Sequence, residues 1–208
     1  MFFSSSEIYG DPDKKNIPTR EEYNGNVSCI GPRACYDESK RYGETLCMNF
    51  FRQYRIPIKI VRPFNNYGPG LSINDKRVIP DLFKNVLENN NITLFSNGKS
   101  TRTFCYVSDA MEGYLRTLLI GKKGEAYNIG NDKQEISIEK LAKLIIKISN
   151  KKLKIIFKKS KDKDYLIDSP KRRCPSIIKA RKDLLFYPKI SLREGLIRTY
   201  KYYLSPDD

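Results

Sequence analysis

The spacing of hydrophobic residues divides the chain into alternating helical and strand-like segments. Residues 137–149 repeat apolar side chains every three or four positions, which places five on one helical face: Ile138, Leu141, Leu144, Ile145 and Ile148. Further helices are predicted over residues 35–54, 77–90, 108–120 and 191–204. Runs rich in β-branched and aromatic residues predict strands at 56–64, 92–95, 103–107, 125–129 and 153–157. Because helices and strands alternate, we predict an α/β fold.

Two of these helices carry local start signals. Pro80 falls in the first turn predicted for residues 77–90, where its missing N–H costs nothing. Ser191 and Glu194 have the spacing of a capping box at the start of residues 191–204.

The first residues have the pattern of a strand that ends at a site. Residues 2–3 are apolar, residues 4–6 are serines, and a Tyr-Gly turn follows. A buried strand of a parallel sheet delivers polar side chains at its carboxyl end in this way. No strand residues precede these, so we expect that the chain begins at an active site or that an upstream part is missing.

Composition narrows the possible chemistry. The 208-residue chain is 39% hydrophobic and 30% charged, as in soluble globular proteins, and no apolar run reaches membrane-spanning length. It contains no histidine, which excludes Ser-His-Asp and Cys-His catalysis and histidine metal sites. Its five cysteines show no C-x-x-C spacing, so neither a disulfide framework nor a metal site is expected. We expect a cytoplasmic protein without a membrane partner.

The net charge of +15 raises the hypothesis of nucleic-acid binding. Basic residues are dense in residues 151–164 and 169–174, and the first of these segments alternates Lys with Leu, Ile and Phe. That alternation is typical of an edge strand with solvated lysines. No nucleic-acid motif accompanies it, so we expect no nucleic-acid partner. A basic surface also attracts an anionic substrate such as a sugar nucleotide.

The central chemical signal is the pair Tyr36-x-x-x-Lys40. On a helix, residues four apart share one face, so the ammonium group lies beside the phenol. A neighbouring positive charge favours the phenolate form. The phenolate can remove a proton from a sugar hydroxyl while hydride leaves for NAD⁺. By itself the spacing is a weak signal, because it arises by chance in a chain rich in Tyr and Lys.

The order of motifs resembles the extended short-chain dehydrogenase/reductase family, which modifies sugar nucleotides. "SSSEIYGDP" is followed by Y-x-x-x-K and then by a strand running into "RPFNNYGP". The segment "GPRACYDESKR" is typical of the branch that decarboxylates UDP-glucuronate. Further matching segments are "NDKRVIPDLF", "GKSTRTFCYVSD", "YNIGN" and "SPKRRCPSI".

The resemblance implies a partial Rossmann-like fold, a doubly wound parallel sheet that lacks its N-terminal strands. Residues 1–70 would be the C-terminal part of the NAD-binding domain. Residues 71–208 would mostly form a small α/β substrate domain, with some segments returning to the Rossmann sheet. The glycine-rich dinucleotide turn G-x-x-G-x-x-G does not occur in this sequence. A fragment, a mis-called start and a split gene all remain open.

The resemblance also assigns catalytic roles to five residues: Ser5, Glu7, Tyr36, Lys40 and Arg173. Ser5 would hydrogen-bond the sugar 4-hydroxyl and the Tyr36 phenol. Glu7 would lie near the substrate carboxylate, and Arg173 near C5 of the sugar. Glu7 follows Ser6, whereas 4,6-dehydratases carry Asp-Glu at these two positions, which favours decarboxylation.

Binding residues follow from the same resemblance. Asn66 and Arg77 would contact NAD together with Tyr36 and Lys40. The substrate-binding residues would be Ser6, Asn65, Arg102, Tyr106 and Arg173. Guanidinium groups suit anionic ligands because they offer paired, permanently charged donors.

The expected function is NAD-dependent conversion of UDP-glucuronate to UDP-xylose through a 4-keto intermediate. The alternatives are a nucleotide-sugar 4-epimerase, a dTDP-glucose 4,6-dehydratase, or an inactive truncated paralogue that binds a UDP-sugar or a partner subunit. The expected partners are the UDP-sugar, a second copy packed through the Tyr36 helix, and possibly a separate N-terminal half.

Overall fold

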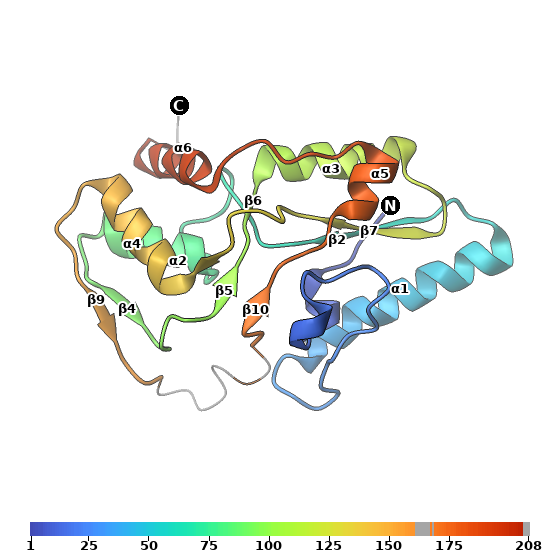
Figure 1. Cartoon of the computed structure of the whole chain (residues 1–208), viewed down its shortest axis with the longest axis horizontal. Helices are drawn as coiled ribbons and strands as arrows, with labels where there is room; N and C mark the ends of the chain where they lie inside the picture. The colour runs from blue at the N-terminus through green and yellow to red at the C-terminus, as the bar shows by residue number, and fades with distance from the viewer. Residues whose placement is uncertain (161–166, 168, 206–208) are drawn as a thin grey trace.

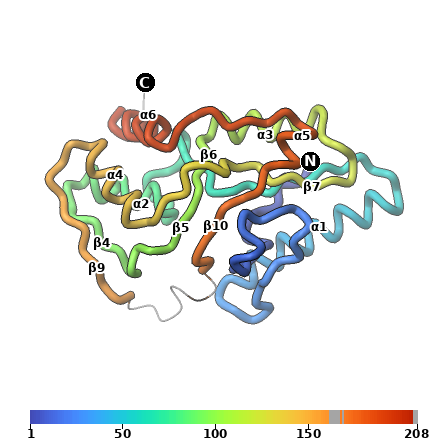
Figure 2. The backbone as a smooth tube through the Cα atoms, viewed as in Figure 1, coloured from blue at the N-terminus to red at the C-terminus, as the bar shows by residue number. Residues whose placement is uncertain are grey.

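The computed structural model describes residues 1–160, 167 and 169–205. Figure 1 shows two groups of elements side by side. One group is built around a parallel sheet, and the other around a cluster of helices. The tube in Figure 2 shows the chain passing repeatedly between the two groups, so residues after 70 contribute to both.

A three-stranded parallel sheet forms the first group. Its order is β1 (Phe2–Phe3), β2 (Lys59–Pro63) and β7 (Glu125–Ile129). Helix α1 (Ala34–Tyr54) lies on one side of the sheet, and α3 (Val107–Ile120) and α5 (Ile178–Leu184) lie on the other (Figure 1). Parallel strands with helices on both faces confirm the predicted Rossmann-like α/β architecture. β7 enters this sheet from the part of the chain beyond residue 70.

The core of this group lies between the sheet and helices α3 and α5. Val61, Tyr127 and Ile129 from the strands are fully buried against Ala110 of α3 and Leu184 of α5. Strand residues buried on both faces read as continuous apolar runs, which explains why these strands were found from sequence.

The second group is built mainly from helices. These are α2 (Val78–Leu87), α4 (Ile138–Ser149) and α6 (Leu192–Leu204), and beside them β4 (Ile92–Leu94) pairs with β9 (Ile155–Phe157). The predicted face of α4 points inward, with Leu141 and Ile145 fully buried. Phe83 of α2 stacks on Tyr200 of α6 with ring centroids 5.7 Å apart. The group therefore has its own hydrophobic core.

Short pairings join the two groups. β10 (Arg172–Arg173), β5 (Thr101–Arg102) and β8 (Ile136–Ser137) form one small sheet, and β3 (Asn66–Tyr67) pairs with β6 (Cys105–Tyr106). Two 3₁₀ helices, η1 (Ser6–Tyr9) and η2 (Lys14–Asn16), lie between β1 and α1. These small elements carry many of the predicted site residues.

Element ends follow local chemistry. Ser191 caps α6 by accepting from the backbone N–H of Glu194 at 3.2 Å, as the spacing predicts, but the Glu194 carboxylate pairs with Arg198. The helix predicted over 77–90 ends earlier, at Leu87, because Asn89 adopts a left-handed conformation with φ of 59°. Residues 161–164 of the predicted lysine-rich edge strand lie outside the described residues.

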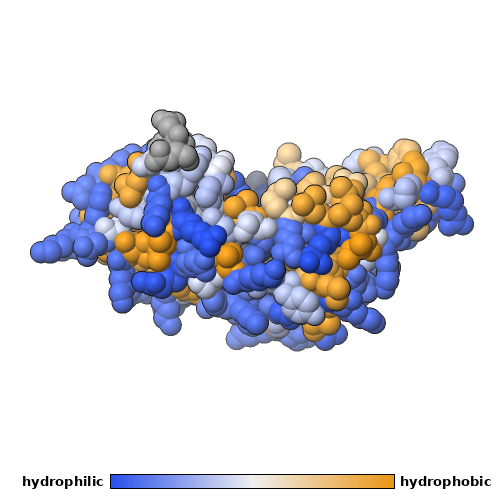
Figure 3. Space-filling model, turned by 90° about the horizontal axis from the view of Figure 1, so that it is seen from above, coloured by the Kyte–Doolittle hydropathy of each residue, from blue (hydrophilic) through white to orange (hydrophobic). Residues whose placement is uncertain are grey.

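Two surface features complete the fold. In the part of the chain that the structure describes, no helix is both long and apolar enough to cross a membrane. Figure 3 shows apolar patches separated by polar side chains on the face that carries α3 and α6. The exposed hydrophobic residues of α3 are Met111, Leu115, Leu118, Leu119 and Ile120.

Candidate active site

A cavity of about 440 Å³ lies where the two groups of elements meet. Six of the predicted site residues line it: Glu7, Asn65, Asn66, Arg77, Arg102 and Arg173. They come from η1, the end of β2, β3, the start of α2, β5 and β10, which are distant in sequence. A larger cavity of about 810 Å³ beside residues 15–24 holds none of the predicted residues, so we place the candidate site in the smaller one.

Glu7 is held by two arginines at the edge of this cavity. Arg173 Nη2 donates to Glu7 Oε2 at 2.8 Å, Arg173 Nη1 donates to Oε1, and Arg33 Nη2 donates to Oε2 at 2.6 Å. Burial is the largest single effect on Glu7 and by itself would raise its pKa. The charges and hydrogen bonds of Arg173 and Arg33 together outweigh burial and hold the pKa of Glu7 below its usual value. Glu7 is therefore ionised.

Arg33 is the functional candidate that sequence reasoning missed. It lies just before α1, three residues ahead of Tyr36, and lines the cavity. Its position inside the "GPRACYDESKR" segment was the available signal. The Y-x-x-x-K spacing in that segment points to Tyr36 and Lys40, and it does not single out the arginine.

Arg102 adds a second, unbalanced positive charge. Its guanidinium donates to the carbonyl oxygens of Thr101 at 2.8 Å and Pro170 at 2.5 Å. Burial, and then repulsion from Arg173, lower the pKa of Arg102 to about 10. Among the described residues it forms no ion pair. The cavity therefore has an excess of positive charge, which attracts anionic ligands.

The two asparagines have different surroundings. Asn65 has φ of 42°, a left-handed conformation that asparagine tolerates, and its Nδ2 donates to the carbonyl of Thr103 at 2.8 Å. Asn66 Nδ2 donates to the Tyr114 hydroxyl. Asn66 Oδ1 is buried and has no hydrogen-bond donor within the described part of the chain. A buried acceptor of this kind is costly unless a ligand supplies the donor.

Tyr36 and Lys40 share one face of α1, as the spacing predicts. Lys40 Nζ lies 5.8 Å from the centroid of the Tyr36 ring and donates to the carbonyl of Phe3 at the end of β1 at 3.0 Å. The Tyr36 side chain is 50% exposed. An ammonium group has three donors, so this bond leaves two for a ligand or for the phenol. Neither residue belongs to the lining of the 440 Å³ cavity.

The remaining predicted residues are distributed around this arrangement. Ser5 is buried, and its hydroxyl accepts from the backbone N–H of Glu7 at 3.2 Å rather than meeting the Tyr36 phenol within the described contacts. Ser6 is buried at the start of η1. Arg77 pairs with Asp75 at 2.9 Å at the cavity edge.

Tyr106 lies outside the cavity lining. Its ring packs edge-on against Tyr67, with centroids 5.7 Å apart, inside the core of the second group. The guanidinium carbon of Arg198 lies 5.8 Å from the Tyr106 ring centroid. In this structure Tyr106 is thus a core residue, and its expected contact with substrate stays a prediction.

The residues present fit the nicotinamide end of NAD. The unpaired acceptor Asn66 Oδ1 matches a carboxamide N–H donor, and Lys40 can donate to ribose hydroxyls near the half-exposed Tyr36 ring. No glycine-rich turn for the pyrophosphate occurs in the sequence. Within the described residues, no group of three or more acidic or cysteine side chains is placed to bind a metal ion.

Comparison with known proteins identifies relatives that match nearly the whole chain. A UDP-glucuronic acid decarboxylase of Arabidopsis thaliana is 42% identical over 196 residues, which cover 94% of this chain and 55% of that protein. UDP-glucuronic acid decarboxylase 1 of Xenopus tropicalis is 39% identical and covers 98% of this chain and 46% of that protein. The chain thus spans about half the length of these curated relatives.

Solved structures show the same architecture. UDP-glucose 4-epimerase of Thermotoga maritima with UDP-glucose has a TM-score of 0.87 and covers 100% of this chain and 63% of its own, at 24% identity, which shows the fold alone. UDP-glucuronic acid 4-epimerase of Bacillus cereus, in complex with UDP-glucuronic acid and NAD, has a TM-score of 0.80 at 31% identity and covers 98% of this chain and 60% of its own.

The family match agrees with the motifs and with the fold. Residues 1–130, which contain the sheet, η1 and the Tyr36 helix, match the NAD dependent epimerase/dehydratase family. The resemblance inferred from the order of the motifs is thereby confirmed. The chain belongs to the NAD dependent epimerase/dehydratase family.

Proposed function

We propose that this chain carries the acid–base and sugar-binding residues of an NAD-dependent enzyme that decarboxylates UDP-glucuronate to UDP-xylose. The observation that carries this proposal is the ion-paired cluster of Glu7, Arg33 and Arg173 at the edge of a cationic cavity. Similarity to UDP-glucuronic acid decarboxylases over nearly the whole chain supports it.

Oxidation of the sugar at C4 is the first step of the proposed reaction. NAD⁺ would be held by Tyr36, Lys40, Asn66 and Arg77, and would supply the acceptor for the C4 hydride. Tyr36 takes the proton of the 4-hydroxyl, and Lys40 stabilises the phenolate through its positive charge. Ser5 orients the hydroxyl. The new C4 carbonyl lies β to the uronate carboxyl group, so the electrons of the breaking C–C bond can move into it.

Loss of CO₂ is the step that defines the proposed activity. Glu7, Arg33 and Arg173 together carry one net positive charge, which attracts the uronate carboxylate to the cavity. As CO₂ leaves, negative charge moves to the C4 oxygen, and Arg173 stabilises this enolate. A proton from solvent then adds to C5, and during the return of hydride to C4 Tyr36 gives its proton back to the C4 oxygen. Asn65 and Arg102 hold the diphosphate side of the substrate.

The assembly and location of the protein belong to the same proposal. A homodimer through α1 is supported by exposed aromatic residues on that helix in addition to Tyr36, namely Tyr42, Phe50 and Tyr54. We place the domain boundary near residue 70 and the protein in the cytoplasm. β1 lies at the edge of its sheet, which would also permit pairing with a separate N-terminal half.

The decisive assay supplies the full-length protein and NAD with UDP-glucuronate labelled at its carboxyl carbon. The proposal predicts release of labelled CO₂. A 4-epimerase would instead change the configuration of UDP-glucuronate at C4 without CO₂. A 4,6-dehydratase would consume dTDP-glucose, and an inactive paralogue would bind the UDP-sugar in calorimetry without turnover. Any of these three results would reject decarboxylation and leave the fold assignment intact.

A further inference from the structure

We infer that Arg62 and Arg41 are positioning residues that hold the Tyr36 helix against the segment bearing Ser5 and Glu7. Neither arginine has been given a role in the chemistry above. Both connect α1 to η1, the two elements that must be aligned for proton transfer. The kinetic part of this inference rests on the proposed function, and its structural part does not.

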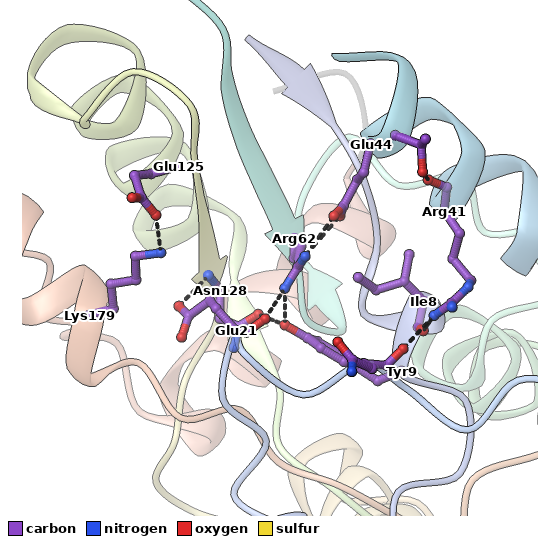
Figure 4. A network of polar contacts seen from close by, with 11 residues as sticks. Ile8, Tyr9, Glu21, Arg41, Glu44, Arg62, Glu125, Asn128 and Lys179 are labelled. Atoms are coloured by element: carbon purple, nitrogen blue, oxygen red, sulfur yellow. Dashed lines mark hydrogen bonds and ion pairs between the residues drawn. The ribbon is translucent and has the colours of Figure 1, made fainter. Parts of the chain in front are cut away.

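Arg62 forms the central connection. It projects from β2 and is only 9% exposed. Its Nε and Nη2 donate to both carboxylate oxygens of Glu44 at 2.8 and 2.6 Å (Figure 4). Glu44 lies on α1 four residues after Lys40, on the same face of the helix. The pair thus fixes α1 one turn beyond the proposed catalytic lysine.

The third nitrogen of Arg62 reaches η1. Nη1 donates to the Tyr9 hydroxyl at 2.7 Å and to the Glu21 carbonyl at 2.8 Å. Tyr9 ends η1, two residues after Glu7, and its own hydroxyl donates to Asn128 Oδ1 of β7 at 2.8 Å (Figure 4). One guanidinium therefore contacts both α1 and η1, and Tyr9 extends the network to the central sheet.

Arg41 makes a second connection between the same two elements, this time from a side chain on α1 to the backbone of η1. It projects from α1, next to Lys40, and its Nη1 donates to the backbone carbonyls of Ile8 at 3.0 Å and Asn24 at 2.6 Å. Figure 4 shows Arg41 and Arg62 approaching η1 from two sides. Two independent connections restrict rotation of η1 relative to α1 more than one would.

The hydrogen bonds at position 62 require an arginine. A buried ion pair is weak evidence for stability, because desolvation of both charges offsets their attraction. What the planar fork of Arg62 adds is a fixed arrangement of three donors that lysine, with a single nitrogen, cannot reproduce. Displacements of about 1 Å between catalytic groups can cost about 10²-fold in rate. We therefore assign these arginines to alignment rather than to stability.

The test compares Arg62→Gln, Arg62→Lys and Tyr9→Phe with the unchanged full-length protein. We expect Arg62→Gln to lower kcat for UDP-glucuronate by about 10²-fold, with KM changed less than about twofold, because the substrate cavity is not touched. Arg62→Lys should not restore the rate. Tyr9→Phe removes one hydroxyl and keeps the Arg62–Glu44 pair, so it should fold and show a smaller loss of kcat.

Two controls separate alignment from general destabilisation. Arg116→Gln breaks a surface pair with Glu112 on α3, and Ile145→Val removes a buried methyl group in α4. Both should keep kcat near the unchanged value. If Ile145→Val lost kcat to the same extent as Tyr9→Phe, or if Arg62→Lys restored full kcat, the positioning role would be rejected.

A measurement without turnover completes the test. Hydrogen exchange of the NAD-loaded protein should speed up in both residues 4–10 and residues 34–44 of Arg62→Gln, and in neither segment of Arg116→Gln. Unchanged exchange in both segments would overturn the inference. If the unchanged protein released no CO₂, the proposed function would fail, while the exchange result would still decide whether Arg62 aligns η1 with α1.

Discussion

At the scale of single residues, the site depends on how one carboxylate and one phenol are surrounded. Glu7 is ionised because two arginines face it, although it is largely buried. Tyr36 is half-exposed, beside an ammonium group tethered to the end of β1. Removing one titratable group at a time should therefore separate binding from chemistry.

Tyr36→Phe should reduce NADH formation from UDP-glucuronate at least about 10²-fold, because only the titrating hydroxyl is lost. Substrate binding should persist, since Tyr36 does not line the cationic cavity. NADH fluorescence in a single turnover, before the hydride returns to C4, and calorimetry measure the two effects. Tyr42→Phe, on an exposed position of the same helix, is the matched control and should retain activity. Normal NADH formation by Tyr36→Phe would mean that another group is the base.

Glu7→Gln should change the pH dependence of stability. Because the folded pKa of Glu7 is below its usual value of 4.5, its stabilisation is present above that value and is lost as pH falls through the folded pKa. Near pH 7 the variant should lose about 2 kcal/mol in free energy of unfolding, since Arg173 is left buried without its carboxylate.

Urea titrations near pH 7 and near pH 3 test this expectation. The difference between Glu7→Gln and the unchanged protein should shrink at the lower pH, because below 4.5 the unfolded chain takes up a proton at Glu7 more readily than the folded protein does. Glu22→Gln, at an exposed carboxylate, is the control. A difference that stays constant across this range would contradict the ion-paired state of Glu7.

At the scale of elements, close packing of helices on the sheet outweighs local preference. Gly113 lies in the middle of α3, where glycine is a poor helix former. An added Cβ would lie 2.6 Å from Ile129 Cγ2 and 3.1 Å from Phe186 Cε2. The glycine therefore allows α3 to approach β7.

Gly113→Ala should lower the free energy of unfolding by about 1–3 kcal/mol. Alanine gains up to about 1 kcal/mol in helix propensity, which the overlap with the β-branched Ile129 exceeds. Thermal or urea unfolding measures the result. Ser108→Ala, at an exposed position in the first turn of α3, should be nearly neutral. If Gly113→Ala were stabilising, α3 would have to pack further from the sheet than it does here.

At the scale of the whole molecule, the surface has both excess charge and uncovered apolar residues. The net charge of +15 is compatible with an anionic substrate, and arginines gather in the cavity between the two groups of elements. The outer side of α1 exposes Tyr42, Phe50 and Tyr54. Helix α1 covers one face of the sheet, and exposed aromatic rings on such a helix favour association with another copy of the chain.

Phe50→Glu combined with Tyr54→Glu should shift the protein from dimer to monomer, because buried carboxylates would oppose packing of α1 against its counterpart. Light scattering at several concentrations reports the mass. Tyr187→Glu places the same charge at an exposed tyrosine after α5 and should leave the mass unchanged. A monomeric unchanged protein, or a dimer that survives both substitutions, would exclude the α1 interface.

The sequence by itself determined the periodic elements and the family. The inward face of α4 follows from apolar spacing, because burial of one side of a helix imposes a period of 3.6, and β7 follows from its run of β-sheet-favouring residues. Tyr36 and Lys40 were predicted from their four-residue spacing together with the family resemblance of the motifs around them. Motifs of this kind can be recognised from sequence because their residues lie close together along the chain.

Only the tertiary structure decided which residues meet across long sequence distances. The ion pair of Glu7 with Arg173 joins segments 166 positions apart. Arg33, to which the sequence assigned no role, also pairs with Glu7. The structure also placed Tyr106 in a core and Arg62 between α1 and η1. Ion pairs and cavities arise where elements cross, and the spacing of residues along a chain does not encode which ends of which elements come together.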